Sequence, residues 1–212
     1  MKKKNMIIAI ILTVISVVYT LCVKYIDVKN IGPNNSSVGF ASMNKFFNNL
    51  IGNHMWIYKI TEVFGIILLL LVVIYGAIGI GQLIHRKNPF KVDPEIIKLG
   101  CFYVLMLLVY ILFEKVVINY RPILIDGELE ASYPSSHTIL SLCVALSSLI
   151  VSHRYFNKNY IKLINGITIG LMLVVLLGRM LSGVHWISDI IGGVIISLTL
   201  LSYFKLVYYW KK

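Results

Sequence analysis

Residues 161–208, IKLINGITIGLMLVVLLGRMLSGVHWISDIIGGVIISLTLLSYFKLVY, contain two apolar segments joined by a short polar break. Segments 161–177 and 188–208 each approach the roughly 20 apolar residues that a helix needs to cross a hydrocarbon core about 30 Å thick. Ionisable residues are costly beside such a core, and they are usually functional. This stretch therefore predicts two membrane helices with a functional site at their junction. The break, residues 178–189, contains Arg179, His185 and Asp189.

Four further segments have the same length and apolar character. The chain has 212 residues, 58% of them hydrophobic, and its mean hydropathy of +0.83 is far above that of a soluble domain. We predict an all-α polytopic membrane protein, a bundle of six transmembrane helices that forms a single domain over residues 1–212. No cleavage pattern follows the first segment, so we expect it to be retained. The four segments are residues 6–23, 60–84, 97–118 and 135–152.

The net charge of +11 follows the topology that six spans impose. The side that holds both termini has thirteen basic residues against only Asp93 and Glu95, whereas the other side has seven basic and seven acidic residues. This asymmetry obeys the positive-inside rule and predicts cytoplasmic termini. It also indicates contact with anionic lipid and not with nucleic acid. The thirteen are Lys2, Lys3, Lys4, Arg86, Lys87, Lys91, Lys98, Arg154, Lys158, Lys162, Lys205, Lys211 and Lys212.

Polar residues gather in the connections that this topology places outside. Connections 119–134 and 178–187 follow the third and fifth spans, which both run outward, so the two connections emerge on one face. The longest connection, residues 24–59, contains apolar residues at helical spacing over 43–51. We expect a short amphipathic helix there, acting either as a lid or in substrate entry. The sequence thus predicts one site on the outer face.

Residues 134–137, Pro-Ser-Ser-His, open the fourth span. Proline and serine favour a helix start, and the free N–H groups of a helix N-terminus bind anions. Ser135 and Ser136 alone would be equally consistent with a simple helix cap. His137 is harder to explain by packing, because it lies at the membrane surface. These residues therefore indicate an anion site.

His185 and Asp189 are four residues apart, so on one helix the carboxylate would accept a hydrogen bond from one ring nitrogen. The other nitrogen would then be free as a nucleophile. A structural hydrogen bond and a pair of metal ligands are the alternatives, although no compact third and fourth ligands accompany the pair, and we predict no metal. Arg121 and Arg179 could each extend to lipid headgroups. Together, on the face with two histidines, they indicate a phosphate site.

These motifs resemble the signatures of the type 2 phosphatidic acid phosphatase superfamily. Residues 134–137 are similar to its second signature, and Gly178-Arg179 followed by His185 and Asp189 is similar to its third. All three signature regions fall within about residues 56–200. Members that resemble this chain are bacterial lipid phosphate phosphatases with six membrane helices.

The resemblance implies a role for each matching residue. His185 would be the nucleophile that forms a phosphohistidine, Asp189 would orient it, and His137 would be the general acid. No metal or other cofactor would be required. The phosphate would be held by Arg121, Ser135, Ser136 and Arg179.

Three positions depart from the family pattern. Ser136 stands where glycine is usual, and Gly178 stands where serine is usual. In the first signature the family spaces a lysine six residues before Arg-Pro, whereas Lys115 has five before Arg121, and Glu114 holds the expected position. One residue is a rotation of about 100° on a helix. Lys115 is therefore a phosphate-binding candidate only if the chain leaves helical geometry before Arg121.

We predict an integral membrane phosphatase that hydrolyses a lipid phosphate or diphosphate at the outer face of a cell membrane. Expected substrates are undecaprenyl diphosphate, phosphatidylglycerophosphate or phosphatidic acid. The alternatives are a lipid phosphotransferase that uses the same phosphohistidine and a non-catalytic lipid-binding or transport protein. A binder would need the arginines but not the ordered set of His137, His185 and Asp189, which favours an enzyme. No segment predicts a particular oligomeric state.

Overall fold

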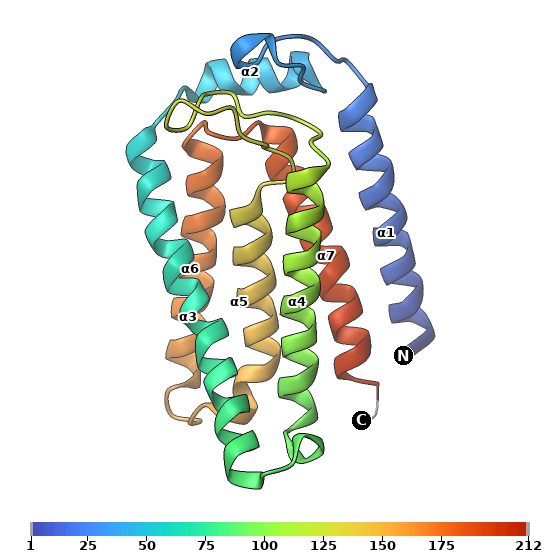
Figure 1. Ribbon diagram of the computed structural model, residues 1–212, viewed down its shortest axis with the longest axis vertical. Helices are drawn as coiled ribbons and strands as arrows, with labels where there is room; N and C mark the ends of the chain where they lie inside the picture. The colour runs from blue at the N-terminus through green and yellow to red at the C-terminus, as the bar shows by residue number, and fades with distance from the viewer. Residues whose placement is uncertain (1, 211–212) are drawn as a thin grey trace.

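The computed structural model describes residues 2–210, so Lys211 and Lys212 of the predicted basic side lie outside the described residues. Six long helices and a short one form the described chain (Figure 1), and the six are long and apolar enough to cross a membrane. The prediction of an all-α, six-span membrane bundle is confirmed. The helices are α1 (Lys2–Tyr25), the short α2 (Ala41–Ile51), α3 (Met55–Arg86), α4 (Pro94–Lys115), α5 (Ser136–Tyr155), α6 (Ile161–Leu181) and α7 (Ile187–Tyr208), with 3-10 turns at Pro33–Asn35 and Pro89–Lys91.

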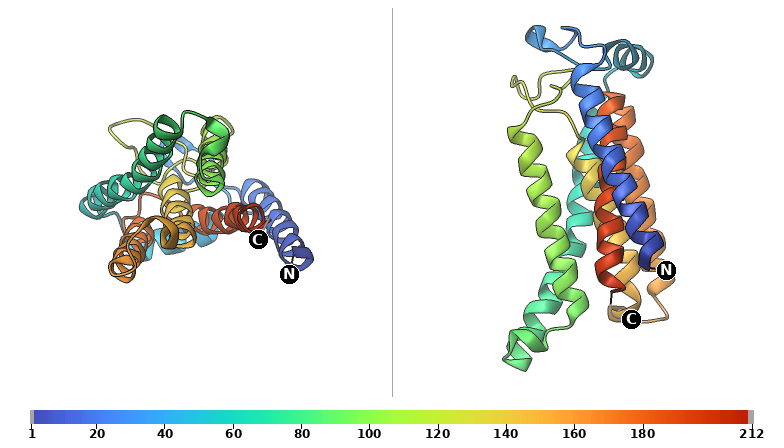
Figure 2. Two further views of the ribbon diagram at one scale, coloured as in Figure 1. Left: turned by 90° about the horizontal axis from the view of Figure 1, so that it is seen from below. Right: turned by 90° about the vertical axis from the view of Figure 1, so that its right-hand side faces the viewer.

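Helix α5 lies at the centre of the bundle. It contacts α3, α4, α6 and α7, and the end-on view of Figure 2 shows these helices around it, with α1 outside against α7. Its buried faces carry small hydroxyl side chains, which let neighbouring helices approach closely. Ser141, Ser147 and Ser152 each donate a hydrogen bond to a backbone carbonyl three residues earlier. The hydroxyls are therefore satisfied without water.

Helix α1 is attached to the bundle by hydrogen bonds. The hydroxyls of Ser16 and Thr199 lie 2.8 Å apart, and those of Thr20 and Tyr133 lie 2.7 Å apart. Lipid tails compete equally well for apolar side chains, so packing alone does not select one position for a peripheral helix. Each such bond contributes about 0.6 kcal/mol in a membrane. These bonds specify where α1 docks.

The two ends of the bundle differ in what they carry. The described chain ends lie with the α3–α4 and α5–α6 connections, whereas the connections that follow α4 and α6 lie at the opposite end, under α2 (Figure 1). At the end with the chain termini, Arg86 pairs with Asp93 at 2.8 Å and Arg154 with Glu95 at 2.9 Å. The polar connections that were expected to form one site therefore do share one end of the bundle.

Helix α2 lies across that end, where the sequence predicted a short amphipathic helix. Its buried Asn44 donates from Nδ2 to Ser188 Oγ at 2.9 Å and accepts from Ser188 N at 3.1 Å. Phe46 and Leu50 are exposed on its other side. Asn44 thus fixes α2 to the first turn of α7.

Candidate active site

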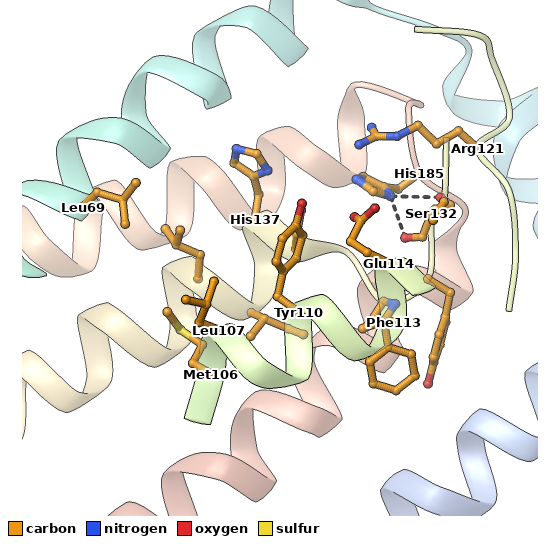
Figure 3. Close-up of a pocket in the computed structure, with 16 residues that line it drawn as sticks. Leu69, Met106, Leu107, Tyr110, Phe113, Glu114, Arg121, Ser132, His137 and His185 are labelled. Atoms are coloured by element: carbon orange, nitrogen blue, oxygen red, sulfur yellow. Dashed lines mark hydrogen bonds between the residues drawn. The ribbon is translucent and has the colours of Figure 1, made fainter. Parts of the chain in front are cut away.

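A cavity of about 390 Å³ lies between α3, α4 and α5, beneath the connection that joins α4 to α5. Figure 3 shows that its two ends differ: apolar side chains line one end and polar side chains line the other. The lining fits a molecule with an apolar body and a polar head. The apolar end carries Leu69, Met106 and Leu107, and the polar end carries Arg121, Ser132, His137 and His185.

The connection from α4 to α5 folds back on itself and brings Arg121 near Ser132. Ser132 N donates to Asn119 O at 2.8 Å, and Tyr120 is bridged to Ala131 in antiparallel fashion. The reversal falls at Asp126-Gly127, whose φ angles are 50° and 85°. Asp-Gly is favoured in such a turn because both residues tolerate the left-handed region, glycine most readily.

The non-helical break between the last two spans is shorter than predicted. Only residues 182–186 separate α6 from α7. Arg179 therefore lies in the last turn of α6, Asp189 lies in the first turn of α7, and His185 lies in the connection. The expectation that His185 and Asp189 pair across one helical turn is wrong, because the helix begins after His185.

Ser132, which the sequence reasoning missed, connects His185 to Asp189. Nδ1 of His185 is 4.0 Å from Oδ2 of Asp189, beyond hydrogen-bond distance. The Ser132 hydroxyl lies 3.0 Å from that nitrogen and donates to Asp189 Oδ2 at 2.6 Å. The Ser132 carbonyl oxygen lies 3.1 Å from the same nitrogen. A carbonyl only accepts, so Nδ1 carries the hydrogen and Nε2 keeps its lone pair.

Asp189 is completely buried, and donors surround its carboxylate. Oδ1 accepts from Asn119 Nδ2 at 3.2 Å and from Ser188 Oγ at 3.3 Å, while Oδ2 also accepts from Trp186 N at 3.0 Å. A buried carboxylate is tolerated only when it is hydrogen-bonded in this way. Residues of the α4–α5 connection and of the start of α7 therefore fix the carboxylate behind His185.

The site is rich in buried nitrogen atoms that lack a hydrogen-bond partner within residues 2–210. They belong to four side chains whose charges act on one another, and buried polar atoms are normally paired. Such a concentration of donors fits an anion with several oxygens. The atoms are Nε2 of His185, Nδ1 of His137, Nε and Nη1 of Arg121, and Nε and Nη1 of Arg179. Arg121 Nε also lies 3.0 Å from Oε2 of Glu130, as an ion pair.

Burial lowers the pKa of His185 well below its ordinary value of 6.5, and the positive charges of Arg121 and Arg179 lower it further. The imidazole is therefore neutral at physiological pH. With hydrogen on Nδ1, its free lone pair is on Nε2, which has the character of a nucleophile.

The two serines that open α5 have different positions. Ser136 lines the cavity next to His137, as the phosphate-binding prediction requires. Ser135 is completely buried and does not line the cavity. Its N donates to Asp189 O at 3.1 Å, and its Oγ accepts from Thr138 Oγ1 at 3.0 Å. The structure thus uses Ser135 to join α5 to α7.

Lys115 is not brought into the site. It is the exposed last residue of α4 and does not line the cavity, whereas Glu114 does. The chain leaves helical geometry only after Lys115, so the rotation of about 100° per residue turns its side chain away from the side that Glu114 occupies. The proposed phosphate contact of Lys115 has no support in this geometry.

Helix α3 supplies two site residues that were not predicted. Glu62 Oε1 pairs with Arg179 Nη2 and lies 3.3 Å from His137 Nε2. The Tyr58 ring lies against the Arg179 guanidinium, 4.6 Å from centroid to carbon. The available signal was Glu62 itself, an acid inside an otherwise apolar span.

Gly178 allows α3 to approach Arg179. A Cβ at this position would lie 2.3 Å from Cγ2 of Thr61 on α3, which is closer than two carbon atoms can pack. The close approach explains glycine where the family signature usually has serine.

Within residues 2–210, no three His, Cys, Asp or Glu side chains are grouped so that they could hold a metal ion.

Comparison with known proteins agrees with the motifs and the fold. The family model of the PAP2 superfamily matches residues 62–212, which include every predicted site residue. The crystal structure described as the first transmembrane PAP2 type phosphatidylglycerolphosphate phosphatase from Bacillus subtilis has the same fold, with a TM-score of 0.64. At 18% identity, the match covers 96% of this chain and 97% of that one. No curated protein sequence matches the chain. The chain belongs to the PAP2 superfamily, the type 2 phosphatidic acid phosphatase superfamily that its motifs resemble.

Proposed function

We propose that this protein is a membrane lipid phosphatase that hydrolyses a lipid phosphate or diphosphate through a phosphohistidine. The observation that carries the proposal is the set of buried nitrogens without a hydrogen-bond partner, which belong to Arg121, His137 and His185 at the polar end of the cavity and to Arg179, the ion-pair partner of Glu62. Phosphate oxygens would accept hydrogen bonds from Arg121, Arg179 and the N-terminal turn of α5 at Ser136. The lipid chain would extend toward Leu69 and the apolar wall of α4.

In the first proposed step, Nε2 of His185 attacks phosphorus and the bond from phosphorus to the leaving oxygen breaks. His137 protonates that oxygen, which leaves as a lipid alcohol or, from a diphosphate, as a lipid monophosphate. The imidazole of His185 becomes positively charged as the P–N bond forms. Ser132 and Asp189 offset this charge through the hydrogen on Nδ1.

In the second proposed step, water attacks the phosphohistidine. His137, now neutral, accepts a proton from the water, and the P–N bond breaks to release inorganic phosphate and regenerate His185. Catalysis of this type depends mainly on positioning and on charge stabilisation around the phosphoryl oxygens.

A substrate panel with the purified protein tests the function. Undecaprenyl diphosphate, phosphatidylglycerophosphate and phosphatidic acid are the expected substrates, and phosphatidylglycerophosphate comes first because of the B. subtilis structure. We expect free phosphate, an acid-labile phosphoprotein in rapid-quench samples, and neither with His185→Ala. Activity should persist in a chelator. A newly phosphorylated lipid would indicate the phosphotransferase, and lipid binding without turnover would indicate the non-catalytic protein.

We also propose that the site faces outward, because the basic connections lie at the end with the chain termini. A cysteine introduced as Glu128→Cys, in the turn near Gly127, should react with an impermeant thiol reagent in intact cells. Lys158→Cys, in the α5–α6 connection, is the matched control and should react only after lysis. The reverse pattern would invert the topology.

A further inference from the structure

Glu62 lies outside all the sequence motifs, yet it contacts two of the residues that they predict. Its Oε1 pairs with Arg179 Nη2 from α6 and lies 3.3 Å from Nε2 of His137 on α5. Within residues 2–210, no other acid forms an ion pair with either side chain. A carboxylate in an apolar span is expensive unless it is paired, so this position of Glu62 needs an explanation.

The contact with Glu62 determines how His137 presents its two nitrogens. The Glu62 carboxylate lies 3.3 Å from Nε2 as an ion-pair partner, and an ionised carboxylate only accepts hydrogen bonds, so its charge favours a hydrogen on Nε2 of His137. The second nitrogen, Nδ1, is buried without a partner, and His137 lines the same cavity as His185 and Arg121 (Figure 3). Nδ1 is therefore the nitrogen that remains available for a group bound in the cavity.

We propose that Glu62 is a positioning residue, which makes Nδ1 of His137 the atom that exchanges protons with substrate and stabilises the imidazole while it is positively charged. This inference rests on the proposed phosphatase function. The arrangement parallels the other histidine, where Ser132 and Asp189 hold Nδ1 of His185 and leave Nε2 free. Each of the two histidines thus has one nitrogen held by acidic or hydroxyl groups and one nitrogen free.

The proton balance of both steps follows from this assignment. In the first step the proton on Nδ1 of His137 moves to the leaving oxygen as its bond to phosphorus breaks. The hydrogen on Nε2 stays with Glu62, so a neutral imidazole with a lone pair on Nδ1 remains. In the second step that lone pair accepts the proton of the attacking water. His137 returns to its starting form, still held by Glu62.

Arg179 does not depend on Glu62 alone for its position. The Tyr58 ring packs against its guanidinium, and Arg179 is completely buried in the last turn of α6. Removing the charge of Glu62 should therefore affect proton transfer by His137 more than it affects phosphate binding by Arg179. This difference makes the proposal testable with a single amide substitution.

The test uses Glu62→Gln and two substrates with different leaving groups. A lipid phosphate monoester expels an alkoxide that must be protonated, whereas 4-nitrophenyl phosphate expels a stable phenolate. General acid catalysis contributes about 10²–10⁴-fold, and we expect kcat to fall roughly 10–100-fold for the lipid phosphate and less than about threefold for the aryl phosphate. In a His137→Asn background, adding Glu62→Gln should cause no further loss on the lipid phosphate.

Equal losses on both substrates, no loss on the lipid phosphate, or full additivity with His137→Asn would overturn the role of Glu62. Glu128→Gln, the same change at an exposed acid of the α4–α5 connection, is the matched control and should retain wild-type rates. If Glu62→Gln does not give folded protein, Glu62→Asp, which withdraws the carboxylate by one methylene, is judged by the same criteria. Wild-type protein that releases phosphate from neither substrate would instead refute the phosphatase function.

Discussion

Nδ1 of His185 and Oδ2 of Asp189 lie 4.0 Å apart, and the hydroxyl of Ser132 bridges them. The carboxylate therefore acts on the imidazole through a third side chain and not by direct contact. This serine comes from the connection between α4 and α5, whereas the other two residues flank the start of α7. The geometry of His185, the proposed nucleophile, thus depends on how that connection packs on α7.

Ser132→Ala should slow the reaction without abolishing it. The substitution removes the link to Asp189 but keeps the Ser132 carbonyl, which still accepts the hydrogen on Nδ1 of His185. A hydrogen bond to a charged group contributes about 1.5–3 kcal/mol, so kcat should fall roughly 10–100-fold with little change in KM. Steady-state kinetics on a lipid phosphate measures this. A loss as large as that of His185→Ala, or none, would contradict the bridging role.

In the pH profile of kcat/KM, the acid limb, where activity falls as His185 takes up a proton, should have its midpoint below pH 6.5. Burial, with Arg121 and Arg179, holds the pKa of His185 well below that value, so the neutral nucleophile persists into acid. Arg121→Gln removes one positive charge and should move the limb to higher pH, whatever its effect on the rate. Below about pH 6.5 the unfolded chain takes up a proton that folded His185 does not. The contribution of neutral His185 to the free energy of unfolding is therefore full above that pH, and it is lost as the pH falls toward the pKa of His185 in the folded protein. A wild-type limb at or above pH 6.5 would refute this assignment.

Lys115→Ala should leave kcat/KM within about twofold of wild type, because Lys115 is exposed and does not line the cavity. Arg121→Ala should lower kcat/KM by roughly 100-fold, since a donor aimed at developing charge contributes about 2.7–4 kcal/mol. The two variants remove one positive charge each and differ in position. Comparable losses in both would show that Lys115 reaches the phosphate.

Gly178→Ala should destabilise the protein, because its Cβ would collide with Cγ2 of Thr61. Overpacking of this kind typically costs about 1–3 kcal/mol. Thr61→Ser deletes that methyl group and keeps the hydroxyl, which donates to Tyr58 O at 2.7 Å. The double variant should therefore recover most of the loss in thermal unfolding measured in detergent. An additive double variant would show that the collision is not the cause.

The parts of the fold and site that the sequence predicted are those with local signals. Hydropathy marks the six spans, and the order of the spans puts Arg121, His137 and His185 at one end of the bundle. Ser132 has no such signal, and the signal of Glu62 is only that it is an acid inside an apolar span. Ser132 reaches His185 only because the α4–α5 connection reverses, and Glu62 reaches His137 only because α3 packs closely on α5. Both depend on tertiary packing, which a linear motif does not encode.

The break between α6 and α7 is shorter than the sequence predicts, for a related reason. Gly178 and Arg179 look like loop residues in a sequence, yet both are helical, because α6 continues until Leu181. Glu62 and Tyr58 on α3 contact the arginine inside the bundle, so the helix need not end before it. The charge of Arg179, just beyond the predicted span 161–177, thus marked a site contact and not a helix end.

The hydrogen bonds that attach α2 to the bundle continue to Asp189 and Ser132, which support the proposed nucleophile His185. Asn44 donates to the hydroxyl of Ser188, and that hydroxyl donates to Asp189, the carboxylate behind Ser132 and His185. Exposed Phe46 and Leu50 lie on the same short helix as Asn44. A change in the tilt of α2 would therefore act on the support of the proposed nucleophile.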